Sequence, residues 1–207
     1  MFDEILNYRK DFPILDETKS NSVIYLDNTA TTQKPKQVIQ AMTAFLNNEN
    51  ATVHRGIYGL SQEATIRCDQ IREDIKSFIN AASVNEVIFT KGATESINLV
   101  ATSYVEAFLQ EGDEIIITQM EHHANIVPWQ LVCEKNNLKL QVISISQEGE
   151  LNLRELKEKC SKKTKFVAFT HISNVLGTVN PVEEITKIVR DNTDAKILID
   201  GAQAIAH

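Results

Sequence analysis

The sequence predicts an α/β protein with a mainly parallel sheet that is covered by helices on both faces. From residue 86 onward, short apolar segments rich in β-branched residues alternate with longer segments of helical periodicity. Such alternation is typical of βαβ units, which build parallel sheets. The segments at 114–118 and 196–200 are also largely apolar, as expected for strands buried on both faces.

The first 85 residues predict helices separated by polar loops. The apolar residues between positions 36 and 46 recur at three- and four-residue spacing, which indicates one buried helical face. Cys68 lies on the apolar face of a longer helix, and we interpret it as a buried small side chain rather than a reactive thiol. We expect helices at 2–10, 36–46 and 60–79, a strand at 23–26 and an exposed loop at 50–56.

Apolar patterns and capping residues predict the strands and helices after residue 86. Asn152 and Glu155 have the spacing of a capping box at a helix start. Asn180 precedes Pro181, and this pair predicts an N-cap followed by the first residue of a helix. We expect strands at 86–90, 114–118, 138–145, 165–170 and 196–200, and helices at 97–108, 125–136, 152–160 and from 180 onward.

The composition limits the class of protein. The chain has 207 residues, of which 43% are hydrophobic, so it can bury one sizeable core. Its net charge of −7 and the absence of a basic cluster argue against nucleic acid as a partner. The sequence shows neither a membrane-length apolar run nor a signal peptide at its start. Three widely spaced cysteines suit a reducing cytoplasm and form no metal-binding pattern.

Chemically suggestive residues directly follow the predicted strands, where open α/β sheets bind their ligands. The turn at 91–96 opens a helix, and free backbone N–H groups there suit a phosphate. Later turns offer an imidazole from His122 or His123, and then Asn174, Asp200 and Gln203. Each turn taken alone is also typical of ordinary capping. Together they are what pyridoxal phosphate requires, because the acid keeps the pyridine nitrogen protonated and the ring can then accept electrons.

Six short runs, found in this order along the chain, give a specific resemblance. They are YLDNTA at 25–30, VHRG at 53–56, GATESINL at 92–99, MEHHAN at 120–125, SNVLG at 173–177 and DGAQ at 200–203. This set resembles the class V aminotransferase family of fold type I, and most closely its SUF-type cysteine desulfurases and selenocysteine lyases. The resemblance implies the large domain of fold type I, with an N-terminal segment at 1–85 and a cofactor-binding domain at 86–207 that is incomplete at its C-terminus.

The resemblance also implies a role for each matching residue. His122 and Asp200 are expected to be catalytic, His122 by stacking on the cofactor ring and Asp200 by pairing with the pyridinium. Thr94 and the backbone of Ala93 are expected to bind the phosphate of the cofactor. Asn174 and Gln203 are expected to contact the ring hydroxyl. The expected substrate contacts come from Asn174, His54 and Arg55. The family often has Thr in place of Ala93, and this change removes one hydroxyl but leaves the backbone donor.

Other family features are expected beyond residue 207. The resemblance assigns the Schiff-base lysine, the persulfide-forming cysteine and a carboxylate-binding arginine to later sequence. Cys133 and Cys160 fall on predicted helices, and neither resembles that nucleophile. We therefore expect an N-terminal half that is inactive alone. The family's strand order also leaves the strand at 86–90 without neighbours and exposes the apolar edge at 197–199 to aggregation.

For the complete enzyme, the resemblance implies conversion of L-cysteine to L-alanine, with the sulfur passing as a persulfide to iron–sulfur cluster assembly. It also implies a cytoplasmic homodimer and a sulfur-acceptor protein of the SUF system. L-selenocysteine is the alternative substrate. Two other interpretations stay open at this point, namely half of another class V aminotransferase or lyase and a non-catalytic interaction module. A nucleotide-binding domain ranks last, because the chain has neither a Gly-x-Gly-x-x-Gly run nor a P-loop.

Overall fold

The computed structural model describes residues 8–16 and 23–207. Most of the predicted helix at 2–10 lies outside these residues. The chain divides into two compact units, Met1–Phe89 and Thr90–His207. The domain boundary expected after residue 85 stays a prediction. Within the described residues, no helix is long and apolar enough to cross a membrane.

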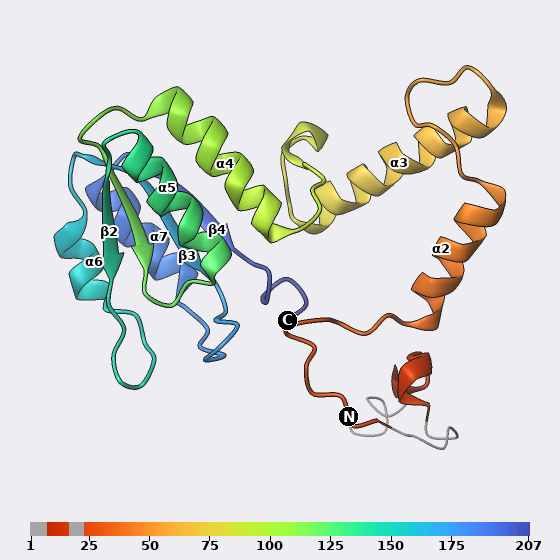
Figure 1. The fold of residues 1–207 in the computed structure, drawn as a ribbon, viewed down its shortest axis with the longest axis horizontal. Coiled ribbons are helices and arrows are strands. Elements are labelled where there is room, and N and C mark those ends of the chain that lie inside the picture. The colour runs from red at the N-terminus through yellow and green to blue at the C-terminus, as the bar shows by residue number, and fades with distance from the viewer. Residues whose placement is uncertain (1–7, 17–22) are drawn as a thin grey trace. The chain divides into compact units, whose positions relative to one another are not determined.

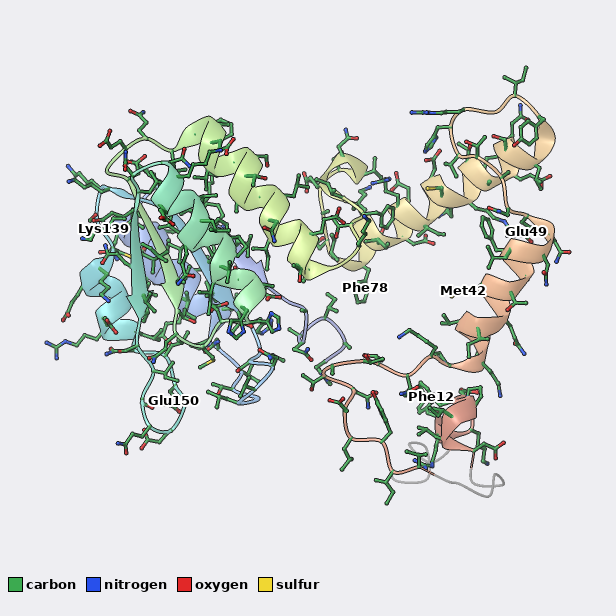
Figure 2. The ribbon with its side chains drawn as sticks, in the orientation of Figure 1. Phe12, Met42, Glu49, Phe78, Lys139 and Glu150 are labelled. Carbon is green, nitrogen blue, oxygen red and sulfur yellow. The ribbon has the colours of Figure 1, made fainter. Side chains whose placement is uncertain are left out.

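The first unit consists of two long helices with connecting loops (Figure 1). Helix α2 spans Lys36–Asn48 and α3 spans Gly59–Phe78, which confirms both predicted helices. Short 3₁₀ turns lie at Pro13–Leu15 and Val84–Glu86. Much of the apolar surface of these helices is open, and Met42 and Phe78 are 62% and 71% exposed (Figure 2). Cys68 is half-buried, so its predicted burial is only partial.

Two predicted strands of the first 90 residues are wrong. The segment at 23–26 is extended but pairs with no strand in the part of the chain that the structure describes. Ile24 and Leu26 are 85% and 89% exposed there. The segment at 86–90 begins in a 3₁₀ turn and continues without a ladder. An apolar pattern favours a strand, but a strand forms only where its backbone groups find a partner.

The second unit is built on a four-stranded parallel sheet with the order β2-β1-β3-β4 (Figure 1). The strands are β1 Glu114–Thr118, β2 Lys139–Ile143, β3 Thr164–Thr170 and β4 Lys196–Asp200. These bounds lie close to the predicted ones. All five residues of β1 are buried, as expected for a central strand covered on both faces.

Helices cover both faces of this sheet, as predicted. Helices α4, Ala93–Phe108, and α5, Val127–Lys135, pack on one face around the buried Trp129 and Phe166. Helices α6, Leu153–Lys159, and α7, Val182–Asn192, pack on the other face around Phe169. A 3₁₀ turn, η3 His123–Asn125, precedes α5, which begins two residues later than the helix predicted at 125–136.

One predicted cap forms only in part, and the other does not form. Asn152 caps α6 by accepting the N–H of Glu155 at 3.0 Å, but the Glu155 carboxylate bonds instead to Ser144, 2.8 Å from its backbone N–H. Helix α7 begins at Val182, so Pro181 rather than Asn180 stands at its N-cap position. The side-chain amide of Asn180 donates instead to the carbonyl of Thr170 at 2.7 Å.

Candidate active site

A pocket of about 150 Å³ lies at the carboxyl edge of the sheet in the second unit. Four segments meet there, namely the N-terminus of α4 and the loops that follow β1, β3 and β4. The lining residues include every residue predicted to bind the cofactor. They are Ala93, Thr94, His122, Ala124, Thr170, Ile172, Asn174, Asp200, Ala202 and Gln203. The structure thus brings together side chains that lie more than 100 positions apart in the sequence.

Asp200 is the last residue of β4, and it is held by its neighbours on both sides. It pairs in register with Thr170 at the end of β3, and its carbonyl accepts the N–H of His171 at 2.9 Å. Its Oδ1 accepts the N–H of Ala202 at 2.9 Å. This short turn fixes the half-buried carboxylate at the end of the strand, and Gln203 directly follows the turn, three residues after Asp200.

The N-terminus of α4 forms one side of the pocket. Gly92 precedes the helix with a φ of 154°, a conformation that favours glycine over other residues. Ala93 and Thr94, the first two residues of the helix, line the pocket. The Ser96 hydroxyl lies 2.8 Å from that of Thr90, so it supports the turn instead. The positive end of the helix dipole therefore faces the pocket from a rigid turn.

His122 presents its ring to the pocket from the start of η3. Its Nδ1 accepts the N–H of Ala124 at 3.1 Å, and its carbonyl accepts the N–H of Asn125 at 2.7 Å. In the neutral imidazole, this arrangement leaves the proton on Nε2. The ring of His123 stands nearly perpendicular, at 85°, with its centre 6.2 Å away. The two imidazoles therefore face different directions, and His122 is the one that lines the pocket.

Asn174 reaches the pocket from a tightly folded loop after β3. The buried Ser173 hydroxyl accepts the N–H groups of Val175 and Leu176 at 3.3 and 3.1 Å. Gly177 turns the chain with a φ of 71°. The hydroxyl of Thr178 donates to the carbonyl of Gly149 at 3.0 Å, which ties this loop to the one after β2. Asn174 therefore lies in a turn that several hydrogen bonds hold in place.

The sequence interpretation missed one buried acid beside the pocket, Glu121. It is 8% exposed, and its carboxylate accepts hydrogen bonds from Thr118, Asn125 and the backbone N–H of Thr170. Burial raises the pKa of Glu121 to about 7, in spite of these three donors, and the Asp200 carboxylate adds to the rise. No local pattern indicates this burial, because Thr170 lies 49 positions away.

His54 and Arg55 belong to the first unit, so their predicted place at the mouth of the site stays a prediction. His54 has a φ of 62°, and its N–H donates to the Thr65 hydroxyl at 2.9 Å. Its Nε2 lies 3.7 Å from the Asp69 carboxylate. Arg55 is exposed on the same loop. These contacts hold the loop against α3.

Two of the cysteines have surroundings that disfavour the reactive thiolate. Cys133 is 5% exposed on α5, and burial raises the pKa of its thiol to about 11. Burial also raises the pKa of Cys160, which is half-buried at the end of α6. Since the thiolate is the nucleophile, neither side chain suits the persulfide chemistry. This agrees with the interpretation made from the sequence.

Comparison with known proteins places this fold in one family. The model of the aminotransferase class-V family matches residues 24–207. The chain therefore belongs to the aminotransferase class-V family.

Within that family the chain is similar to cysteine desulfurases. It is 48% identical over 204 residues to the one from Wigglesworthia glossinidia brevipalpis, covering 98% of this chain and 50% of that protein. It is 50% identical over 200 residues to the one from Serratia proteamaculans, covering 96% and 49%. The apo structure of cysteine desulfurase from Thermococcus onnurineus NA1 superposes with a TM-score of 0.89 at 41% identity, covering 98% of this chain and 48% of that one. The chain thus spans about half the length of the relatives that it matches.

Proposed function

We propose that this chain forms the pyridoxal phosphate-binding half of a cysteine desulfurase. The observation that carries the proposal is the single pocket whose lining includes Ala93, Thr94, His122, Asn174, Asp200 and Gln203. The similarity to cysteine desulfurases along nearly the whole chain supports the choice of this activity within the family.

The chemistry of these groups fits the cofactor. The N-terminus of α4 and the Thr94 hydroxyl offer hydrogen-bond donors to a phosphate. The carboxylate of Asp200 suits a protonated pyridine nitrogen, and it lines the same pocket as the start of the helix. The amides of Asn174 and Gln203 suit the ring hydroxyl. His122 offers a flat ring that can lie against the pyridine.

The residues of this chain would divide the work as follows. When bound, pyridoxal phosphate supplies an electron-poor ring that takes up the electron pair left on the α-carbon of the substrate. Asp200 holds a proton on the pyridine nitrogen, and the ring stays electron-poor as a result. His122 keeps water from one face of the ring, and Asn174 orients the substrate carboxylate.

The complete reaction, in this proposal, converts L-cysteine to L-alanine and leaves a persulfide sulfur for iron–sulfur cluster assembly. The cofactor lysine, the persulfide cysteine and the carboxylate-binding arginine would come from the remaining part of the full-length polypeptide. We further propose that this polypeptide works as a cytoplasmic homodimer and passes sulfur to an acceptor protein of the SUF system. L-Selenocysteine is the alternative substrate.

The test is product analysis with the full-length polypeptide that contains this chain, purified with pyridoxal phosphate. With L-cysteine and a reductant, we expect alanine and sulfide in equal amounts. A parallel reaction with L-selenocysteine measures selenocysteine lyase activity and distinguishes it from cysteine desulfurase activity. Transfer of the amino group to a keto acid without release of sulfide would instead identify another class V aminotransferase. Failure to bind the cofactor would favour a non-catalytic module.

A further inference from the structure

The buried carboxylate of Glu121 joins three elements beside the pocket. Its Oε1 accepts the backbone N–H of Thr170, at the end of β3, at 3.0 Å and also accepts the hydroxyl of Thr118, at the end of β1. Its Oε2 accepts the side-chain N–H of Asn125, in η3, at 2.6 Å. The side-chain Oδ1 of Asn125 in turn accepts the indole N–H of Trp129 at 2.8 Å.

Burial of this network lowers the stability of the folded state. Thr118 and Thr170 are 5% exposed, and Asn125 and Trp129 are fully buried. Burying a carboxylate raises its free energy, and an apolar residue at this position would avoid that cost. A role other than stability accounts for the acid better, because every donor around it comes from a segment that shapes the pocket.

Two residues of this network, Glu121 and Asn125, flank His122 in the sequence. Glu121 immediately precedes His122 and ties the loop to β3. Asn125 follows three positions later, and its N–H closes the η3 turn on the carbonyl of His122 at 2.7 Å. The N–H of Ala124 meets Nδ1 of the imidazole inside this turn. A shift of either anchor would therefore change the angle of the ring and the hydrogen bond that sets its tautomer.

We propose that Glu121 is a positioning residue for the cofactor site, which fixes the orientation and tautomer of His122 by clamping the loop between β1, β3 and η3. This inference rests on the proposed function, because it assumes that the cofactor occupies the pocket. Glu121 itself acts through His122 and does not need to touch the cofactor. In Glu121→Gln, one carboxylate oxygen becomes an amide N–H₂, which opposes the Asn125 donor instead of accepting from it.

The experiment compares Glu121→Gln with Glu114→Gln in the full-length polypeptide. Glu114 is an equally buried acid at the opposite end of β1, where it pairs with Lys139 at 3.3 Å and accepts from Gln141 at 2.7 Å and Ser161 at 3.0 Å. It controls for the loss of a buried charge far from the pocket. The readouts are the ¹⁵N signals of the His122 imidazole without cofactor, the indole N–H signal of Trp129, and the dissociation constant of pyridoxal phosphate.

We expect wild type and Glu114→Gln to show one His122 tautomer, protonated on Nε2. Glu121→Gln should show mixed tautomers, a shifted Trp129 signal and about tenfold weaker cofactor binding. Thr118→Val, which removes one donor and keeps the side-chain shape, should change the same signals less, and it decides the question if Glu121→Gln does not fold.

Unchanged His122 signals in Glu121→Gln, or equal changes in Glu114→Gln, would overturn the proposal. Unchanged cofactor affinity in Glu121→Gln would also overturn it, provided that the wild type binds the cofactor. If the wild type does not bind pyridoxal phosphate, the proposed function fails, and the His122 signals alone decide the role of Glu121.

Discussion

Oδ1 of Asp200 accepts the backbone N–H of Ala202 at 2.9 Å, immediately after the last residue pair of β3 and β4. This bond fixes the carboxylate where the sheet ends and the pocket begins. An asparagine could keep it, because the amide oxygen accepts in the same way. The bond therefore separates the structural role of Asp200 from its proposed chemical one.

The first prediction is that Asp200→Asn in the full-length polypeptide retains its stability but loses turnover by about 10²-fold or more, because the amide does not hold a proton on the pyridine nitrogen. Steady-state kinetics and thermal unfolding measure the two effects. Asp194→Asn, an exposed change just before β4, is the control and should leave both unchanged. Undiminished turnover in Asp200→Asn would remove this residue from the assignment.

The second prediction concerns the glycine before α4. Alanine at Gly92 would meet no atom within 4 Å, so its cost is the backbone strain at a φ of 154°, about 1–3 kcal/mol. We expect Gly92→Ala to lower the free energy of unfolding by that amount. It should also bind the cofactor less tightly, because the start of α4, which is proposed to bind the phosphate, shifts. Gly112→Ala carries similar strain, at a φ of 86°, far from the pocket. It should lose stability in urea and keep cofactor affinity, and equal affinities in both variants would contradict the account.

The third prediction concerns the acid pH dependence of stability. The ion pair with Lys159 and the hydrogen bonds from Ser144 lower the pKa of Glu155 to about 2. Since the folded-state pKa lies below the unfolded one, this stabilisation is present above about pH 4.5 and is lost as the pH falls toward 2. Glu155→Gln should thus cost about 2 kcal/mol at pH 7 and almost nothing at pH 2.

Urea unfolding at both pH values measures this difference. Glu158→Gln is the matched control on the same helix, because Glu158 forms an exposed pair with Arg154. It should change stability by less than about 0.5 kcal/mol at either pH. A pH-independent cost in Glu155→Gln would show that its effect comes from packing rather than charge.

The sequence predicted the second unit well because its patterns are local. The three isoleucines of β1 are buried on both faces, and the observed strand has the predicted bounds. Asn152 caps its helix as its spacing predicts. The errors all involve distant partners. The apolar segments at 23–26 and 86–90 find no ladder in the described residues, and the side chain of Asn180 bonds to Thr170 rather than to its own helix.

The residues of the candidate site likewise divide into those that local patterns predict and those that depend on distant contacts. Asp200, Asn174 and Thr94 could be found from their positions after strands or at a helix start. Glu121 could not, because its burial depends on Thr170 from another strand. Periodicity and capping rules carry no information about such a contact.

The fourth prediction follows from the sheet order. Strands β1 and β3 have neighbours on both sides, whereas β4 ends the sheet in the described part of the chain. In the 207-residue chain, we expect the slowest amide hydrogen exchange in β1 and β3, weaker protection in β4, and little protection at 87–90. Strong and uniform protection from residue 86 through 200 in a soluble monomer would show that the sheet closes in another way.

The fifth prediction tests the central claim, that the pocket at the carboxyl edge holds pyridoxal phosphate. The measurement is a crystal structure of the full-length polypeptide with the cofactor bound. We expect the phosphate at the backbone of Ala93 and Thr94, the ring against His122 rather than His123, and the pyridine nitrogen within about 3 Å of the Asp200 carboxylate. A cofactor bound elsewhere, or a ring whose nitrogen points away from Asp200, would contradict it.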